Sequence, residues 1–288
     1  MEKIAVALQR TLRSEPHGES LFGPVHEVPP ATTPPVRVPG RIDYTRTRAI
    51  EIAPSVLERH RVAAVANDAN ADAFRMLRTE VLMQMRQNNW RTLAVTSPNK
   101  GAGKSTVALN LAISFAMEVD HTALLVDADL RDPDLRNLLE LGPGPGLADH
   151  LTGKAALEDL LLQPGIGNLV LLPGGAPVAN TSELMRSPMM ADLVRELRTR
   201  YPERLVVFDV PPVLSGADTL ALSTYMDATI MLVEERKTAR KDIERACELL
   251  QNTNLVGVVL NKSRELRKPD PIKWPTPGFL RRVFGPQG

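Results

Sequence analysis

Apolar residues occur along this chain in two alternating patterns. Short, nearly continuous runs of valine, leucine and isoleucine predict buried strands, which we place at residues 92–97, 122–127, 168–172, 204–209, 228–233 and 255–260. Elsewhere apolar residues recur at helical spacing and predict helices over residues 69–87, 104–117, 155–162, 187–200, 217–225 and 237–251. Strands that alternate with helices in this way indicate an α/β fold with a mostly parallel sheet and helices on both faces.

The segments on either side of this α/β region differ from it in composition. Residues 1–14 carry Ile4, Leu8 and Leu12 at helical spacing, which predicts a short helix that either docks on a partner or frays at the terminus. Prolines crowd residues 15–40 and predict an extended linker. The tail mixes aromatic and basic residues, a composition that suits an anionic membrane surface, a partner groove, or folding back onto the domain. We therefore expect three parts: a short helix and linker at 1–60, a compact domain at 61–263 and the tail at 264–288.

A glycine-rich loop connects the first of these predicted strands to a helix, which is the arrangement that phosphate-binding loops require. Gly101 and Gly103 lack a Cβ, so backbone N–H groups can approach a phosphate closely at the positive end of the helix. Lys104 is then expected to reach the β- and γ-phosphates, and the Ser105 hydroxyl to ligate Mg²⁺. The loop is a variant, because Pro98 occupies the place of the first glycine in the usual pattern. Its candidate phosphate-binding residues are Asn99, Lys100, Gly101, Ala102, Gly103, Lys104, Ser105 and Thr106.

Two other predicted strands end in acidic residues. Asp127 and Asp129 lie at the end of the second strand, and Asp209 ends the fourth. The carboxyl ends of parallel strands meet at one edge of a sheet, where α/β proteins bind their ligands. Each aspartate alone could be a solvated residue at a strand end. Together with the glycine loop they predict one site for a nucleotide polyphosphate and Mg²⁺, in which Asp127 or Asp129 orients or deprotonates an incoming hydroxyl.

Composition narrows the function classes. The 35 lysines and arginines almost balance the 34 aspartates and glutamates, and with a net charge of +1 no overall field favours nucleic acid. A single cysteine, Cys247, excludes a disulfide within the chain and is expected to be a small core residue of a helix. No run approaches the roughly 20 apolar residues that a membrane span needs, and residues 1–6 lack the features of a signal peptide. We therefore expect a cytoplasmic protein that reaches a membrane only through a partner.

Taken together, these motifs resemble the bacterial tyrosine kinases of capsule and exopolysaccharide systems, whose ATPase domain belongs with the Min/Par-type P-loop proteins. The resemblance covers roughly residues 68–263 and rests on the glycine loop, Leu-Leu-Val-Asp-Ala-Asp-Leu-Arg at 124–131, Asp-Val-Pro-Pro at 209–212 and Leu-Asn-Lys at 260–262. It implies that Asp127 and Asp129 form the second Walker motif, which Arg131 completes. It also implies that Asp209 is the Walker B carboxylate, acting on Mg²⁺ through water. Asn261 would lie against the adenine of ATP, although a turn-forming asparagine explains that residue equally well.

The same resemblance implies an activity and partners. We expect an ATP- and Mg²⁺-dependent tyrosine kinase that regulates polysaccharide synthesis or export. Its partner would be a membrane-anchored polysaccharide co-polymerase, which would recruit it to the inner face of the membrane. Asp72, Arg75 and Arg78 resemble a Glu-x-x-Arg-x-x-Arg motif through which subunits of the family associate in a ring, with aspartate here in place of glutamate.

Two departures from the family pattern leave other functions open. The tail contains no tyrosine, whereas many family members carry a phosphorylated tyrosine cluster there. Of Tyr44, Tyr201 and Tyr225, only Tyr44 lies outside the predicted folded segments, which makes it the candidate acceptor. A second hypothesis is therefore a regulatory or scaffold ATPase of the same system that does not autophosphorylate. A Par-like partition ATPase is a weaker third, because Asn99 stands where those proteins carry a signature lysine.

Overall fold

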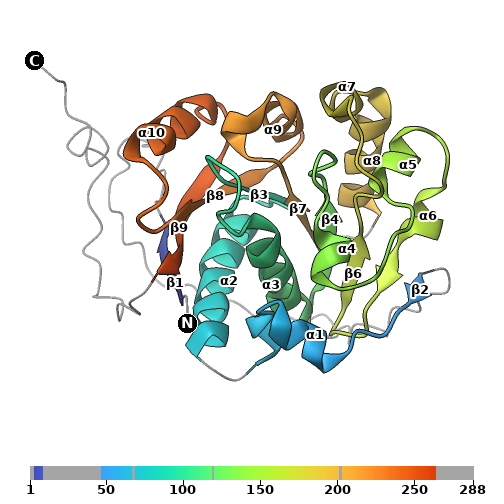
Figure 1. Cartoon of the computed structure of the whole chain (residues 1–288), viewed down its shortest axis with the longest axis horizontal. Helices are drawn as coiled ribbons and strands as arrows, with labels where there is room; N and C mark the ends of the chain where they lie inside the picture. The colour runs from blue at the N-terminus through green and yellow to red at the C-terminus, as the bar shows by residue number, and fades with distance from the viewer. Residues whose placement is uncertain (1–2, 9–46, 67–68, 119, 201–202, 264–288) are drawn as a thin grey trace, which may run out of the picture.

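A twisted sheet with helices on both faces makes up the part of the chain that the computed structural model describes, which is residues 3–8, 47–66, 69–118, 120–200 and 203–263. Its nine strands run in the spatial order β1-β9-β8-β3-β7-β4-β6-β5-β2 (Figure 1). Their bounds are β1 (Lys3–Leu8), β2 (Arg48–Ala49), β3 (Thr92–Thr96), β4 (Thr122–Asp127), β5 (Leu162–Gln163), β6 (Leu169–Leu172), β7 (Arg204–Asp209), β8 (Ala228–Glu234) and β9 (Leu255–Ser263). All neighbouring pairs are parallel except β1 with β9 and β5 with β6. The expected mostly parallel α/β sheet is thus confirmed.

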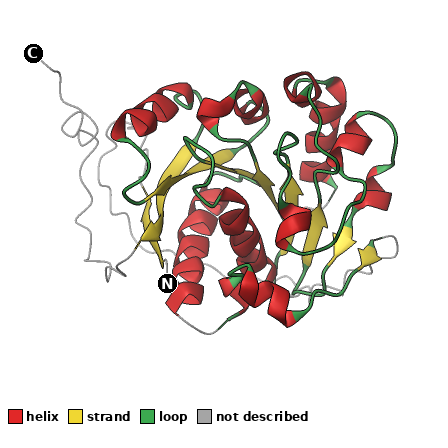
Figure 2. Cartoon of the chain, viewed as in Figure 1, coloured by secondary structure: helices red, strands yellow, loops and turns green. Residues whose placement is uncertain are grey.

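The helices form two layers, one on each face of the sheet (Figure 2). Helices α1, α2 and α3 lie on one face, and α7, α8, α9 and α10 lie on the other (Figure 1). The helix bounds are α1 (Pro54–Arg59), α2 (Ala69–Gln87), α3 (Lys104–Ala116), α4 (Leu135–Leu138), α5 (Leu147–Leu151), α6 (Leu157–Leu160), α7 (Thr181–Met185), α8 (Pro188–Thr199), α9 (Asp218–Ser223) and α10 (Arg240–Leu249), with 3₁₀ turns η1 (Ala63–Val65) and η2 (Val213–Ser215).

The central strands are buried on both faces because alternate side chains enter different cores. In β3, Leu93 and Val95 join the core under α2 and α3, whereas Ala94 joins the core on the opposite face. Strand β7 alternates in the same way, with Val207 in the first core and Phe208 in the second. Continuous apolar runs in the sequence therefore match strands that water does not reach on either side.

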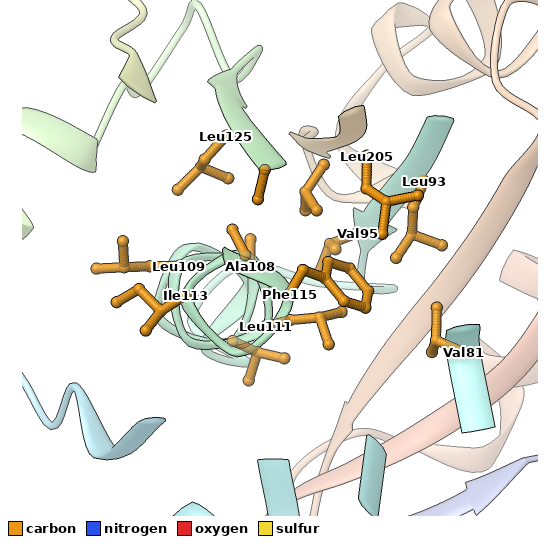
Figure 3. Packing of buried hydrophobic residues seen from close by; sticks show 14 of the residues in the cluster. Val81, Leu93, Val95, Ala108, Leu109, Leu111, Ile113, Phe115, Leu125 and Leu205 are labelled. Atoms are coloured by element: carbon orange, nitrogen blue, oxygen red, sulfur yellow. The ribbon is translucent and has the colours of Figure 1, made fainter. Parts of the chain in front are cut away.

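Helix α3 is buried over most of its length, which fixes the loop that precedes it. Ala108, Leu111 and Phe115 are completely buried and pack among Val95 and other residues of the sheet (Figure 3). Fully burying a side chain of this size stabilises a fold by about 1.5–3 kcal/mol. Because β3 and α3 are both held in this core, the loop between them has two rigid anchors.

The sequence-based prediction fails at the N-terminus. Residues 3–8 form strand β1, which pairs antiparallel with β9, and not the helix that we expected over residues 1–14. Ile4, Val6 and Leu8 also alternate with period two, and pairing with a distant strand decides between the two patterns. The helix expected at 155–162 is likewise shorter, since α6 ends at Leu160 and β5 follows it.

Several expectations fall outside the described residues, including the proline-rich linker, the tail and Tyr44. The division into parts at residues 60 and 263 stays a prediction. Elements β2 and α1 precede residue 61, and Leu57 of α1 packs against the core under α2 and α3. Among the described helices, none combines the length and the apolar character that crossing a bilayer demands.

Candidate nucleotide-binding site

The glycine loop lies where the sequence placed it, between the end of β3 and the start of α3. Gly101 and Gly103 have φ values of 82° and 90°, in the left-handed region that favours glycine. A Cβ on Gly103 would lie 2.5 Å from Nδ2 of Asn261, so a larger residue here would displace that side chain in addition to straining the backbone. Gly103 also caps α3, and the backbone N–H groups of the first turn of that helix are therefore available to an anion.

Strand β9 holds this loop in position from the side. Asn261 donates from Nδ2 to the carbonyl of Ala102 at 2.7 Å, and Lys262 donates from Nζ to the carbonyl of Gly101 at 2.7 Å. The Oδ1 of Asn261 accepts the backbone N–H of Lys262 at 2.9 Å. Both ends of the amide are thus occupied in this state, and Asn261 acts here as a support of the loop. Contact between Asn261 and adenine remains a prediction.

Two carboxylates stand side by side at the ends of β4 and β7, because Asp127 and Asp209 are direct partners in the sheet register. Both are buried, with exposed fractions of 1% and 2%. Asp127 accepts the backbone N–H of Leu135 through Oδ2 at 3.0 Å, but its Oδ1 and both oxygens of Asp209 have no hydrogen-bond partner of ordinary geometry. Buried carboxylate oxygens are normally paired, so these three oxygens fit the binding of a cation.

The environment raises the pKa of both aspartates. Burial raises the pKa of Asp127 well above its usual value, and the neighbouring charges of Asp209 and Asp129 raise it further. Burial also raises the pKa of Asp209 to about 6, against the opposing effects of Lys104 and the Ser105 hydroxyl. A metal ion beside the pair would lower both pKa values and keep both groups ionised.

Lys104 extends to the third aspartate of the site. Its Nζ lies 3.6 Å from Oδ2 of Asp129, and both side chains are nearly buried. Burial raises the pKa of Asp129, Lys104 opposes that rise, and Asp132 adds to it. A lysine held inside the loop in this way can shift from the carboxylate to a phosphate without leaving the site.

The donor set suits Mg²⁺ bound together with a nucleotide. Within the described part of the chain, no group of three or more His, Cys, Asp or Glu side chains forms a complete metal site. Mg²⁺ usually keeps several waters and takes one or two protein ligands together with phosphate oxygens. The unpartnered oxygens of Asp209 and Asp127, with the hydroxyl of Ser105, fit that requirement.

The remaining predicted residues lie around this centre. Asn99 donates from Nδ2 to Asp242 at 2.7 Å, and Lys100 pairs with Asp132 at 3.0 Å on the exposed side of the loop. Thr106 borders a cavity of about 690 Å³ that opens beside the loop.

Arg131 contacts other residues than Lys104 does. Its Nε donates to Thr181 Oγ1 at 3.1 Å and lies 3.2 Å from Oδ2 of Asp218. Asp218 is buried and also accepts hydrogen bonds from the hydroxyls of Thr181 and Ser182. This network ties the segment after β4 to α7 and α9. A role for Arg131 in nucleotide binding remains a prediction.

Sequence analysis assigns no role to three residues that support the site. These are Lys262, which belongs to the Leu-Asn-Lys motif, Asp218, and Asn110, a polar residue inside an apolar helix. The one available signal was Asn110, because a polar residue flanked by apolar ones on a buried helix needs partners. Those partners come from distant segments, which no local pattern reveals.

The residues of the expected ring motif pair within this chain. Asp72 binds Arg75 one turn further along α2 at 2.6 Å, and Arg78 binds Glu118 at 2.7 Å. These side chains are partly or largely exposed, so the pairs contribute little to stability, about 0–1 kcal/mol each, and can exchange partners. Ring formation stays a prediction.

Comparisons with known proteins agree with this fold. A family model described as ParA, NUBPL iron-transfer P-loop NTPase, matches residues 89–269. The tyrosine-protein kinase YwqD of Bacillus subtilis is 31% identical over 194 residues, which cover 67% of this chain and 81% of that protein. A putative tyrosine-protein kinase, CapB of Staphylococcus aureus, is 26% identical over 194 residues, which cover 67% and 84%. The kinase domain of the Escherichia coli tyrosine kinase ETK superposes with a TM-score of 0.67 at 25% identity, covering 77% of this chain and 92% of that domain.

The fold and the loop between β3 and α3 thus define a P-loop NTPase of the ParA type. Within that class, the chain belongs to the bacterial tyrosine-protein kinase family.

Proposed function

We propose that this protein is a cytoplasmic, Mg-ATP-dependent tyrosine kinase of a capsule or exopolysaccharide system. The observation that supports it most is the buried pair Asp127 and Asp209, whose unpartnered oxygens lie beside the P-loop lysine. Family membership supports the tyrosine kinase chemistry and the polysaccharide context. A membrane-anchored co-polymerase is the proposed partner, and it would bring the protein to the inner face of the membrane.

Each residue of the site has a role in this proposal. Backbone N–H groups of residues 101–106 bind the phosphates, and Lys104 moves from Asp129 to the β- and γ-phosphate oxygens. Ser105 and Asp209 would hold Mg²⁺, which neutralises the charge that develops on the transferred phosphoryl group. Asp127 would accept the proton of the tyrosine hydroxyl, because a cation beside the pair keeps this carboxylate ionised, as a general base must be.

The acceptor in this proposal is Tyr44, which lies outside the described residues. Tyr225 is half-buried against the core on the α8 face of the sheet, which argues against its phosphorylation in the folded protein. Acceptors on the partner are also compatible with the site.

Mapping of phosphotyrosine by mass spectrometry tests the proposal. The protein is incubated with Mg-ATP, with and without the cytoplasmic segment of a candidate co-polymerase. Lys104→Met removes the phosphate-binding charge, and Lys241→Met, which removes an exposed lysine on α10, is the matched control. We expect label on Tyr44 or on the partner in the wild type and the control, and none in Lys104→Met.

A regulatory ATPase without kinase output is the second candidate, because residues 264–288 contain no tyrosine. ATP turnover that depends on Lys104 but leaves no phosphotyrosine on either protein would favour it. Salt-sensitive binding to nonspecific DNA would instead favour a partition ATPase.

A further inference from the structure

A second cavity lies at the edge of the sheet opposite the glycine loop. It measures about 560 Å³ and is bordered by α8, by Arg91 directly before β3 and by Tyr225 between α9 and β8. The glycine loop follows the other end of β3, which has 5 residues. At about 3.3 Å per residue, the strand holds its two ends roughly 17 Å apart. The cavity is therefore separate from the candidate nucleotide site.

One face of α8 supplies much of the cavity lining. Ala191, Val194, Arg195 and Arg198 all border the cavity. Their spacing along the helix places them on the same side of it, since residues three, four and seven positions apart share a helical face. Two small apolar side chains and two guanidinium groups therefore border one space.

Arg91 brings a third guanidinium to this cavity, and its charge is not compensated. Its backbone N–H donates to Oδ2 of Asp227 at 2.8 Å, but its side chain makes no hydrogen bond or ion pair within the part of the chain that the structure describes. The whole chain has a net charge of only +1. Three arginines around one cavity are consequently a local concentration of positive charge and not a consequence of a basic protein.

The other two arginines can bind an anion as well. Arg195 pairs with Asp192 at 2.9 Å, but these side chains are 71% and 62% exposed, and such pairs contribute only about 0–1 kcal/mol. Arg198 donates from Nη2 to Oδ1 of Asp227 at 2.6 Å. Because a guanidinium has five N–H donors, Arg198 can hold Asp227 and a ligand at the same time.

These donors suit a phosphoryl group that is attached to a small molecule. The fork of N–H groups in arginine matches the oxygens of a phosphate, and three phosphate oxygens can engage more than one guanidinium. The hydroxyl of Tyr225, which has no hydrogen-bond partner among the described residues, adds a further polar group at the cavity. A volume of about 300–1,000 Å³ is typical of small-molecule sites, so this cavity has room for the carbon skeleton of a ligand beside Val194 and the tyrosine ring.

We propose that this cavity binds a phosphorylated small molecule, with Arg91, Arg195 and Arg198 around its phosphoryl group. The inference goes beyond the proposed function and does not depend on it, since no residue of this cavity belongs to the candidate nucleotide site. Inorganic phosphate shares the recognised chemistry with a sugar phosphate, and the experiment below separates the two.

Calorimetric titration of the full chain tests the proposal. The glycine loop is first saturated with the magnesium complex of a non-hydrolysable ATP analogue, so that the probes do not bind there. The probes are glucose 1-phosphate, inorganic phosphate and glucuronate, which carries a carboxylate and no phosphate. Arg91→Gln and Arg195→Gln each remove one charge from the cavity. Arg245→Gln is the matched control, because Arg245 is also an exposed helical arginine paired with a carboxylate three positions away.

We expect glucose 1-phosphate to bind the wild type and Arg245→Gln equally. Its affinity should fall about ten-fold in Arg91→Gln and about three-fold or more in Arg195→Gln, because each change removes a charged donor. Affinity for the ATP analogue should stay within about two-fold in every variant, which shows that the variants are folded. If Arg91→Gln does not fold, Arg195→Gln at its exposed position decides.

The other outcomes are equally distinct. Inorganic phosphate that binds as tightly as glucose 1-phosphate, and is weakened by the same two variants, would support the phosphoryl site and assign it to the free ion. Absence of saturable binding by both phosphate probes would overturn the proposal. Equal affinity in the wild type, Arg91→Gln and Arg195→Gln would overturn it too, by placing the probe elsewhere. A preference for glucuronate over both phosphates would refute the recognition of a phosphoryl group.

Discussion

At the scale of single residues, Asp209 and Asp127 show how the site is prepared for a cation. Each occupies a strand end where the register of β4 and β7 forces the carboxylates together. The protein alone does not compensate this arrangement, because three of the four oxygens have no hydrogen-bond partner. Bringing unpaired charges out of water costs free energy, which the folded chain bears until a cation binds. The buried carboxylates therefore lower the stability of the fold and at the same time favour the binding of a cation.

This cost predicts a pH-dependent effect of Asp209→Asn in the absence of nucleotide and metal. The pKa of Asp209 is about 6 in the folded protein and about 3.9 in an unfolded chain. Between these values the folded state binds more protons, so the free energy of unfolding falls as pH rises through this window. Two pKa units correspond to about 3 kcal/mol. Because asparagine does not titrate, the stability of the variant relative to wild type should rise by up to about 3 kcal/mol from pH 4 to pH 7.

Urea denaturation at a series of pH values measures this difference. Asp192→Asn, at an exposed position on α8, is the control and should run parallel to the wild type. Addition of Mg-ATP should reverse the order, stabilising the wild type and not Asp209→Asn. Curves for Asp209→Asn that parallel the wild type at every pH would contradict the raised pKa.

At the scale of elements, three parts of the fold hold the P-loop: β3 and α3 at its two ends, and a clamp of two hydrogen bonds from β9. Strand β3 and helix α3 fix its ends, and Asn261 and Lys262 at the end of β9 bind two of its carbonyls. A side chain at Gly103 would meet the Asn261 amide, which would have to give up its place against the loop. The conformation of the loop thus depends on a strand more than 150 positions away in sequence.

Gly103→Ala should therefore disrupt the loop beyond the cost of its backbone angle. The added Cβ would meet Asn261 Nδ2 at 2.5 Å and displace the clamp. Gly142→Ala is a matched control, because Gly142 also has a positive φ of 66° but has no atom within 4 Å of the added Cβ. We expect the control to lose about 1 kcal/mol from backbone strain and to retain ATP binding. Gly103→Ala should lose more stability and most of its ATP affinity, as thermal denaturation and calorimetry would show. Equal behaviour of the two variants would refute the clamp.

The sequence predicted local elements far better than the contacts between them. The strands predicted at 122–127 and 204–209 match β4 and β7 to the residue, because buried parallel strands carry long apolar runs bounded by polar ones. The short apolar pattern at the N-terminus fits the period of a helix as well as the period of a strand, and the prediction of a helix there is wrong. An element of so few residues takes its structure from its partner, here β9.

In the candidate site, too, the residues in local motifs could be predicted from the sequence better than the residues that support them through distant contacts. Lys104 and the three aspartates could be placed at one edge from the ends of three strands. The structure brings Lys104 to Asp129 and sets Asp127 beside Asp209. Asn110 and Lys262 could not be placed, since their partners lie in loops that approach only when the layers pack. Local patterns therefore locate the chemistry, and tertiary contacts determine how the site is supported.

At the scale of the whole molecule, the sheet has two unlike edges. One ends in the two-residue strand β2, and the other ends in β1. Strand β1 covers β9, whose backbone from Gly257 to Ser263 would otherwise be an open edge beside the P-loop clamp. Open edges of this kind pair with other chains. Strand β1 thus replaces an edge strand of 9 residues, β9, with one of 6 residues on this side of the sheet.

Deleting residues 1–8 should therefore make the protein self-associate through β9. Light scattering over a range of concentrations is expected to show the average mass rising toward that of a dimer, because the freed N–H and C=O groups of β9 find partners on a second copy. Deletion of residues 11–18 shortens the chain but retains β1, and this control should show the same mass, relative to its chain length, as the parent at every concentration. The deleted strand, added back as a peptide, should compete with association and restore the parent mass. A truncated protein that stays monomeric at every concentration, with or without the peptide, would mean that the edge of β9 is protected by something other than β1.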